Sequence, residues 1–225
     1  FFGRPTPIMA AVVLPDSWGT TKDKKFPVIY SVPGFGGDHW SWSGRESTRG
    51  TSRAGTEFIF VALHPSCPGG PSVFADSANN GPWGKALTEE LIPYIEKTFR
   101  GVGKPEARFT TGHSSGGWSS LWLQVAYPDF FGGCWSTSPD PVDFRDFQRI
   151  NIYRAGENMF TDPAGAKRPI ARQGETPMLW YKDFSDMERP IRGEQLASFE
   201  TCFSPRSPNG QAMQLWNRDT GAVNA

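Results

Sequence analysis

Residues 107–117 read Ala-Arg-Phe-Thr-Thr-Gly-His-Ser-Ser-Gly-Gly, and the strand, turn and helix that they predict set the fold class. The first five residues form a short apolar run of the kind found in buried strands, and the pattern G-x-S-x-G follows it at 112–116. Apolar residues then recur at helical spacing, at Trp118, Leu121, Trp122 and Val125. The pattern alone is a weak signal. A sharp turn between a strand and a helix, however, is the setting in which a nucleophilic serine is exposed, so the sequence predicts that role for Ser114.

Two glycines flank this serine, and the turn explains both. A side chain at Gly112 or Gly116 would collide with a neighbouring element, because the chain reverses so abruptly there. The helix that follows directs its first N–H groups toward the same point. The alternative interpretation is an ordinary strand-to-helix turn in which the serines serve only as caps.

A second motif, the glycine-rich loop at 33–37, is expected at the same place. It reads Pro-Gly-Phe-Gly-Gly and follows an apolar run. Acyl transfer places negative charge on a carbonyl oxygen, which two fixed N–H donors must stabilise. We expect the N–H groups of Phe35 and Ser115 to form this oxyanion hole. Taken alone, the loop could equally be structural.

Short apolar runs and helical patterns alternate through the first 140 residues. The runs lie at 8–14, 27–33, 57–63, 107–111 and 131–137, and they predict strands buried on both faces. Helices are predicted near 85–100 and 115–127, and Pro93 should kink or break the first of them. This alternation predicts an α/β fold with a mostly parallel sheet flanked by helices.

The domain organisation changes at about residue 140. We expect residues 1–140 to form the α/β core, through the elbow and the strand that follows it. Residues 141–225 carry Pro, Asp, Arg and Asn throughout, with one helical stretch near 194–203, and they predict a cap or a long connection. The sequence shows no internal repeat.

Composition excludes several classes of partner. The 225 residues carry 23 basic and 23 acidic side chains, so no basic field attracts nucleic acid or anionic lipid. No apolar run approaches the ~20 residues of a membrane span. The three cysteines show no metal-binding spacing, and neither a metal nor a cofactor is implied. Neutral charge and nine tryptophans are compatible with an exported bacterial enzyme, but they fix neither compartment nor oligomeric state.

Four segments together resemble a known family. They are Phe26-Pro-Val-Ile-Tyr-Ser-Val-Pro-Gly-Phe-Gly-Gly37, Glu89-Glu-Leu-Ile-Pro-Tyr-Ile-Glu96, Gly112-His-Ser-Ser-Gly-Gly117 and Tyr127-Pro-Asp-Phe-Phe131. In this order they resemble the putative esterase family of α/β-hydrolases, which includes enterochelin-esterase-like, esterase-D-like and feruloyl-esterase-like enzymes. The resemblance covers about residues 8–140 and implies an α/β-hydrolase-like fold and serine esterase chemistry. Pro33 stands where many members have His.

The later half of the family's pattern is missing. The triad of this fold runs Ser, then Asp or Glu, then His along the chain, yet no histidine follows Ser114. We therefore expect the acid and the histidine base outside this chain, and a sheet without its last strands. A solvated loop is the better interpretation of Asp140, Asp143 and Asp146. His113 should pack or hydrogen-bond beneath the site.

Further side chains are candidates for a substrate pocket: His39, Trp40, His64, Asn80 and Trp83. His39 or His64 could in principle replace the missing base, but a pocket-lining or structural role is the stronger interpretation of each. Asn80 and Trp83 could hold a sugar or an aromatic ester, or could simply close a turn.

The sequence thus favours a serine carboxylic-ester hydrolase acting on a small-molecule or glycosyl ester. Two alternatives stay open. The missing histidine suits a non-catalytic hydrolase-fold domain with a binding or structural role. An acyltransferase would use the same nucleophile and differ only in the acceptor of the acyl group.

Overall fold

The computed structural model describes residues 3–42, 51–189 and 194–224, and it divides the chain into two compact units. The first unit comprises Phe1–Cys67 and Pro71–Asp140, and the second comprises Pro68–Gly70 and Pro141–Ala225. The predicted nucleophile and glycine loop both belong to the first unit. The two units are described separately.

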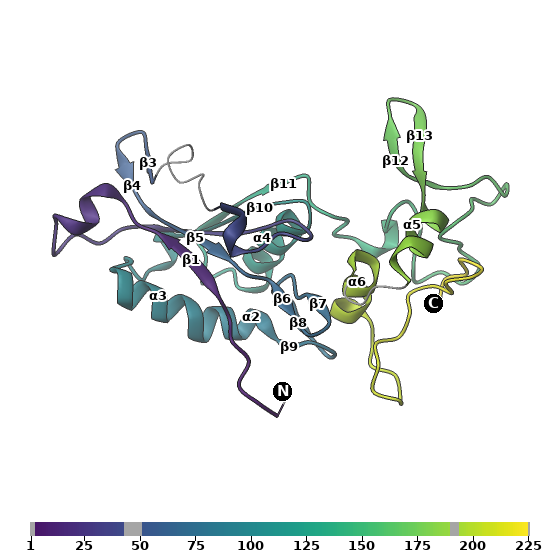
Figure 1. Ribbon diagram of the computed structural model, residues 1–225, viewed down its shortest axis with the longest axis horizontal. Coiled ribbons are helices and arrows are strands. Elements are labelled where there is room, and N and C mark those ends of the chain that lie inside the picture. Colours follow the sequence, from purple (N-terminus) through teal and green to yellow (C-terminus); the bar gives the residue numbers. More distant parts are fainter. Residues whose placement is uncertain (1–2, 43–50, 190–193, 225) are drawn as a thin grey trace. The chain divides into compact units, whose positions relative to one another are not determined.

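A five-stranded sheet in the order β1-β5-β2-β10-β11 forms the centre of the first unit (Figure 1). The strands are β1 (Ala10–Val13), β2 (Val28–Val32), β5 (Ile59–Leu63), β10 (Arg108–His113) and β11 (Gly133–Thr137). The last four run parallel to one another, and β1 pairs antiparallel with β5. Each strand lies within one of the predicted apolar runs or overlaps it, so the predicted mostly parallel α/β fold is confirmed.

Two helices pack against the sheet, the first of them in three consecutive segments. A helix runs from Trp83 to Phe99 as α2 (Trp83–Ala86), a π-helical turn (Leu87–Leu91) and α3 (Ile92–Phe99), and α4 spans Ser115–Ala126. Pro93 was expected to kink or break the first helix. Instead the widened π turn lies directly before α3 and places Pro93 in its first turn, where the missing N–H of proline is tolerated.

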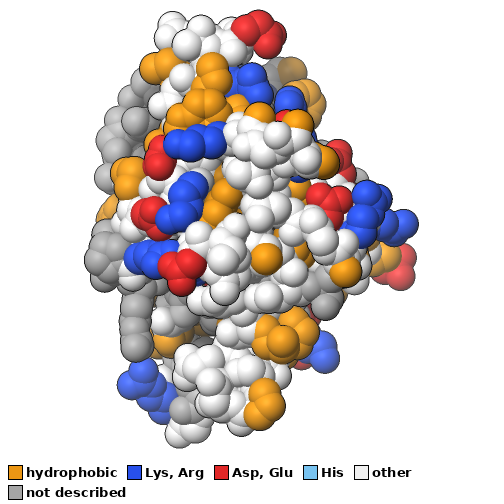
Figure 2. Space-filling view, turned by 90° about the vertical axis from the view of Figure 1, so that its right-hand side faces the viewer, with side chains coloured by type: hydrophobic (Ala, Val, Ile, Leu, Met, Phe, Trp, Pro, Cys, Tyr) orange, Lys and Arg blue, Asp and Glu red, His pale blue; other side chains and the backbone are white. Residues whose placement is uncertain are grey.

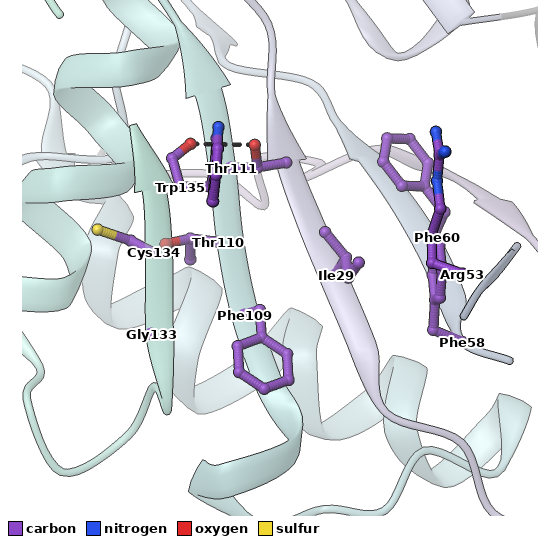
Figure 3. A pocket seen from close by; sticks show the side chains of 10 residues that line it. All are labelled: Ile29, Arg53, Phe58, Phe60, Phe109, Thr110, Thr111, Gly133, Cys134 and Trp135. Carbon is purple, nitrogen blue, oxygen red and sulfur yellow. Dashed lines mark hydrogen bonds between the residues drawn. The ribbon is translucent and has the colours of Figure 1, made fainter. Parts of the chain in front are cut away.

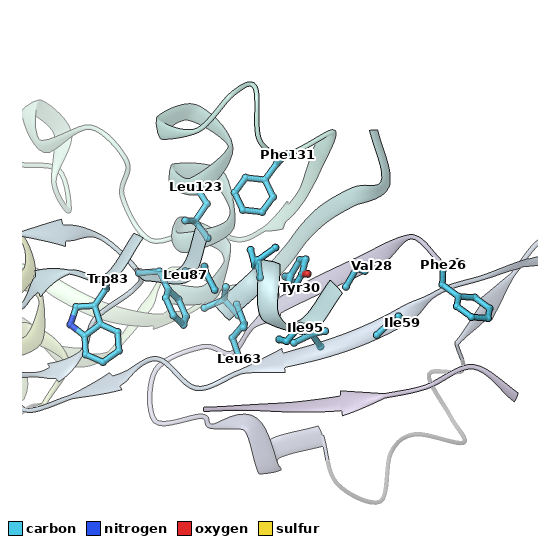
Figure 4. Packing of buried hydrophobic residues seen from close by; sticks show 14 residues of the cluster. Phe26, Val28, Tyr30, Ile59, Leu63, Trp83, Leu87, Ile95, Leu123 and Phe131 are labelled. Carbon is cyan, nitrogen blue, oxygen red and sulfur yellow. The ribbon is translucent and has the colours of Figure 1, made fainter. Parts of the chain in front are cut away.

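One face of the sheet and these helices enclose the main core (Figure 4). Alternate residues of β2 and β5, such as Tyr30 and Ile59, are fully buried against Leu87, Ile95 and Leu123 of the helices. Successive side chains of a strand point to opposite faces, so this alternation places the large buried side chains of β2 and β5 on the helix side. The core therefore fixes the positions of the strands relative to α4.

Among the described residues, the opposite face is only partly covered, and the prediction of strands buried on both faces was wrong for this face. Ile29 of β2 and Phe60 of β5 are half-buried there, and Trp135 of β11 is 74% exposed. These side chains line an open hollow of about 790 Å³ together with Phe109 and Thr111 of β10 (Figure 3). This hollow lies on the face of the sheet and does not include Ser114 among its lining residues.

A nearly buried ion pair ties α3 to β10. The Arg108 guanidinium donates to both carboxylate oxygens of Glu96, over 2.7 and 2.8 Å, and it also stacks on the Phe130 ring. Side-chain exposure is 11% for Arg108 and 6% for Glu96. Burial, aided by the nearby Glu96 charge, raises the pKa of Tyr30, whose hydroxyl faces the same carboxylate. The pair thus fixes the start of β10, the strand that leads into Ser114.

We expect Arg108→Met to lower the free energy of unfolding by about 3–5 kcal/mol, because it leaves the Glu96 carboxylate buried without a partner. The double variant Arg108→Met/Glu96→Leu should recover much of that loss. Urea denaturation of both variants measures this difference. Equal destabilisation of the single and double variants would contradict the account. Lys24→Met breaks the more exposed pair with Glu57, which solvent screens, and should destabilise the chain far less.

Short elements complete the first unit. Strands β3 (Ser52–Arg53) and β4 (Thr56–Glu57) form one hairpin, and β8 (Asp76–Ser77) and β9 (Gly81–Pro82) form another. The remaining strands are β6 (Ser66–Cys67) and β7 (Gly70–Pro71). Short 3-10 helices lie at Asp16–Gly19 (η1), His39–Trp42 (η2) and Pro105–Ala107 (η4).

The second unit has a hydrophobic cluster of its own. Its elements are the 3-10 turn Phe144–Asp146 (η5), the hairpin β12 (Pro169–Gln173) and β13 (Thr176–Trp180), and the helices α5 (Tyr181–Glu188) and α6 (Gln195–Phe203). The predicted helical stretch near 194–203 is confirmed as α6. Phe147, Phe199 and Trp216 pack in the middle of the cluster. The region is therefore a compact body, more ordered than its irregular sequence suggested.

Charges of both signs are mixed on one face of the molecule (Figure 2). On the face shown in Figure 2, basic and acidic side chains lie side by side, without a field of one sign. This fits the equal numbers of basic and acidic residues in the chain. In the described residues, no helix combines the length and the apolar character that crossing a membrane requires.

Candidate active site

Ser114 lies in the turn between β10 and α4, at the carboxyl end of the sheet's fourth strand in spatial order. Its backbone has φ 58° and ψ −125°, a conformation that residues with a side chain rarely adopt. Such strain persists only where surrounding structure enforces it, and it collects at functional sites. The neighbouring contacts show what enforces it: the Ser114 N–H donates to the Thr137 carbonyl at 3.1 Å, and the Ser114 carbonyl accepts from Trp118.

The two flanking glycines are required by close backbone approach. A Cβ on Gly112 would lie 2.1 Å from the carbonyl oxygen of Gly116, and a Cβ on Gly116 would lie 2.1 Å from the carbonyl oxygen of Val32. Both distances are far below contact. The turn therefore accepts only glycine at these positions, as the sequence pattern indicated.

The glycine loop touches the elbow. A Cβ on Gly34 would lie 3.7 Å from the Ser114 Cβ and 3.3 Å from the carbonyl oxygen of His113. The Gly37 N–H donates to the Gly34 carbonyl, which closes a turn around Phe35 and Gly36, with Gly36 at φ 74°. In such a turn the N–H of the second residue, here Phe35, is not engaged by the turn's own hydrogen bond.

The second expected donor is the N–H of Ser115. It is the first residue of α4, and the first N–H groups of a helix have no acceptor within the helix. The partial positive charge at this helix end favours an anion at the same place. Both donors of the expected oxyanion hole therefore belong to segments that meet at Ser114, as the sequence interpretation requires.

Asp140 contacts Ser114, which the sequence did not lead us to expect. The Ser114 hydroxyl donates to Asp140 Oδ1 at 3.3 Å, and the Ser115 hydroxyl donates to Oδ2 at 2.5 Å. The carboxylate was expected in a solvated loop. It arrives here because β11 is the parallel neighbour of β10, so the residues after Thr137 emerge at the same edge as the elbow.

The three histidines have other partners. His39 Nδ1 and His64 Nδ1 lie 3.1 Å apart, and His113 Nδ1 lies 3.2 Å from the Thr137 hydroxyl. His113 is exposed, so it hydrogen-bonds beside the site and does not pack beneath it. Within the described residues, the Ser114 hydroxyl has Asp140 as its hydrogen-bond partner and no imidazole.

The remaining pocket candidates divide into two groups. Trp83 is buried, and its indole N–H donates to the Asn80 carbonyl at 2.9 Å, so these two residues close a turn and also line a small cavity of about 220 Å³. Trp40 is 63% exposed, and its ring lies 4.9 Å from that of His39. His39 is nearly buried and His64 half-buried.

Together these observations define an α/β protein with a sharp, strained strand-to-helix turn at the carboxyl edge of its sheet. A family model described as "Putative esterase" matches residues 4–201, and the chain belongs to this esterase family. The resemblance found in residues 8–140 is thus confirmed, and the family match extends beyond it. No curated protein matches the chain.

Solved structures of three hydrolases are similar to the chain. A ferulic acid esterase is 24% identical, with 58% of this chain and 53% of that chain covered and a TM-score of 0.49. A fluorophosphonate-binding serine hydrolase of Staphylococcus aureus is 18% identical, with 61% and 52% covered and a TM-score of 0.49. An S-formylglutathione hydrolase of Agrobacterium tumefaciens is 21% identical, with 59% and 53% covered and a TM-score of 0.48. The chain spans about half the length of each.

Proposed function

We propose that the chain is a serine carboxylic-ester hydrolase with Ser114 as its nucleophile. The observation that carries this proposal is the strained backbone of Ser114 between two glycines that no other residue could replace. A capping serine would need no such conformation. Membership of the esterase family supports the same reaction class.

In the proposed mechanism the Ser114 oxygen attacks the carbonyl carbon of the ester. A C–O bond forms, the carbonyl π electrons move onto oxygen, and the hydroxyl proton passes to a base. The N–H groups of Phe35 and Ser115 stabilise the oxyanion. Collapse of the intermediate breaks the bond to the alcohol, which takes up the proton, and water then releases the carboxylic acid from Ser114.

The proposed base is not one of this chain's histidines. Among the described residues, the Ser114 hydroxyl donates to Asp140, and no ring nitrogen of His39, His64 or His113 is its hydrogen-bond partner. We propose that the acid and base of the triad lie outside these 225 residues. A small-molecule or glycosyl ester is the proposed substrate class.

Release of 4-nitrophenol from 4-nitrophenyl acetate tests the proposal. We expect a slow release of one equivalent per chain as Ser114 is acetylated, and no such phase in Ser114→Ala. Ser115→Ala is the matched control, because it removes a neighbouring hydroxyl and keeps the backbone donor. A folded chain that shows the same release in Ser114→Ala would refute the nucleophile and favour the binding or structural role.

An added glycosyl alcohol separates hydrolysis from acyl transfer. A hydrolase yields acetate whether or not the acceptor is present. An acyltransferase yields acetylated acceptor in proportion to its concentration. Chromatography of the products distinguishes the two outcomes.

A further inference from the structure

Three potential metal ligands converge beside the glycine loop. The donor atoms of Asp38, His39 and His64 all lie within 4.8 Å of one another. The two imidazoles stand nearly perpendicular, with an angle of 88° between their planes and 4.8 Å between ring centroids. Their Nδ1 atoms face each other at 3.1 Å. The cluster is separate from the hydrogen bonds that hold the Ser114 hydroxyl.

The fold explains why these residues meet although 25 positions separate the two histidines. Asp38 and His39 follow β2, and His64 follows β5, its parallel neighbour in the sheet (Figure 1). The carboxyl ends of parallel neighbours emerge at one edge. The His64 N–H donates to the Met9 carbonyl at 3.0 Å, which holds this position against β1.

The Asp38 carboxylate is oriented and keeps one oxygen for a ligand. Its Oδ1 accepts from the N–H groups of Trp40 and Ser41, at 2.8 and 2.9 Å, and from the Ser41 hydroxyl. Among the residues that the structure describes, none donates a hydrogen bond to Oδ2.

We propose that Asp38, His39 and His64 bind one divalent transition-metal ion of the Zn²⁺ type, through one carboxylate oxygen and the two Nδ1 atoms. Two nitrogens at ~2.0–2.1 Å from a tetrahedral zinc are about 3.3 Å apart, close to the observed spacing. The ion lies to one side of the line that joins the nitrogens, so each ring turns slightly on binding. Two imidazoles and a carboxylate leave a fourth position for water.

The proposed metal site is distinct from the proposed site of ester hydrolysis. Metal binding does not depend on ester hydrolysis. Neighbouring strands are ~4.8 Å apart, and β2 separates β5 from β10, so the ion lies roughly 10 Å from the elbow. A bound ion would link the end of the glycine loop to the end of β5. Metal would therefore stabilise the fold by mass action, because the unfolded chain does not hold these ligands together.

Titration of the tag-free chain with Co²⁺ and Zn²⁺ after chelator treatment tests the proposal. We expect one equivalent of Co²⁺ to give the visible absorption of a tetrahedral site, and Zn²⁺ to displace it. His64→Gln and Asp38→Asn should each weaken binding by at least on the order of 100-fold, the upper end of what the loss of an outer-shell partner costs. His113→Gln is the matched control, since it removes a histidine outside the cluster, and it should bind like the parent chain.

A second measurement needs no variant. Nitrogen-15 spectra of the histidine rings should show Zn²⁺-dependent shifts at the Nδ1 atoms of two histidines and none at the third. Absence of stoichiometric binding, or equal binding by His64→Gln and the control, would overturn the proposal. Equal shifts at all three rings would do so as well, because they would indicate adventitious surface binding.

Discussion

Replacing Gly116 with alanine is expected to lower the free energy of unfolding by on the order of 5 kcal/mol, a large share of what stabilises a domain of this size. The new Cβ would lie 2.1 Å from the Val32 carbonyl oxygen and 2.7 Å from that of Pro33. Both are backbone atoms at the end of β2, which the pairing with β10 holds in place. Relief would require α4 to move away from the sheet and Ser114 to lose its position.

The close backbone contacts predict that Gly116→Ala destabilises the chain, whereas helix propensity alone predicts the opposite. Gly116 lies inside α4, where alanine would ordinarily stabilise the helix by about 1 kcal/mol. Gly133→Ala is the matched control, because a Cβ there would meet only the Phe109 side chain, at 3.6 Å. Urea denaturation compares the two variants. A Gly116→Ala chain as stable as the Gly133→Ala chain would show that the elbow is not packed as described.

The second large effect concerns the catalytic base, which we propose lies outside these 225 residues. We expect the 225-residue chain to acylate on the order of 10⁴–10⁶ times more slowly than an enzyme with a complete triad, because a serine hydroxyl without a base is a weak nucleophile. Dissolved imidazole should accelerate the acylation, since it can accept the Ser114 proton. Stopped assays with 4-nitrophenyl acetate measure both rates. The imidazole-dependent reaction of Ser114→Ala gives the background to subtract.

Histidine variants provide the control. His39→Gln, His64→Gln and His113→Gln, assayed in metal-free buffer, should each change the acylation rate by no more than about threefold, because none of these rings contacts the Ser114 hydroxyl. A loss of 100-fold or more in any one of them would identify a base within this chain. The triad would then be complete but differently ordered.

Much of the first unit could be predicted, because local patterns encode it. The apolar runs placed all five strands of the sheet, and the spacing of Leu87 to Phe99 and of Trp118 to Val125 placed both helices. The elbow followed from the pattern at 112–116 in its strand–turn–helix context, and steric arguments explained its two flanking glycines. The π turn before Pro93 could not be predicted, since it is one of several ways to accommodate a proline.

The features that could not be predicted depend on contacts between residues that are far apart in the sequence. Asp140 reaches Ser114 because β11 pairs in parallel with β10, and its position after a strand was the only signal of that. His39 meets His64 because β2 neighbours β5. The cluster around Trp216 joins residues spread over the second unit, where no strand–helix alternation marks a core. Local patterns specify elements, while pairing between elements specifies which side chains meet.

Labelling with a fluorophosphonate tests the central claim most directly, because this probe forms a covalent bond with an activated serine and reports its position. The chain would be incubated with the probe in imidazole buffer, digested and analysed by mass spectrometry. We expect one phosphonyl group per chain, on Ser114, with labelling lost in Ser114→Ala and kept in Ser115→Ala. A folded chain labelled at another residue, or left unlabelled at Ser114, would contradict the assignment of Ser114 as the nucleophile.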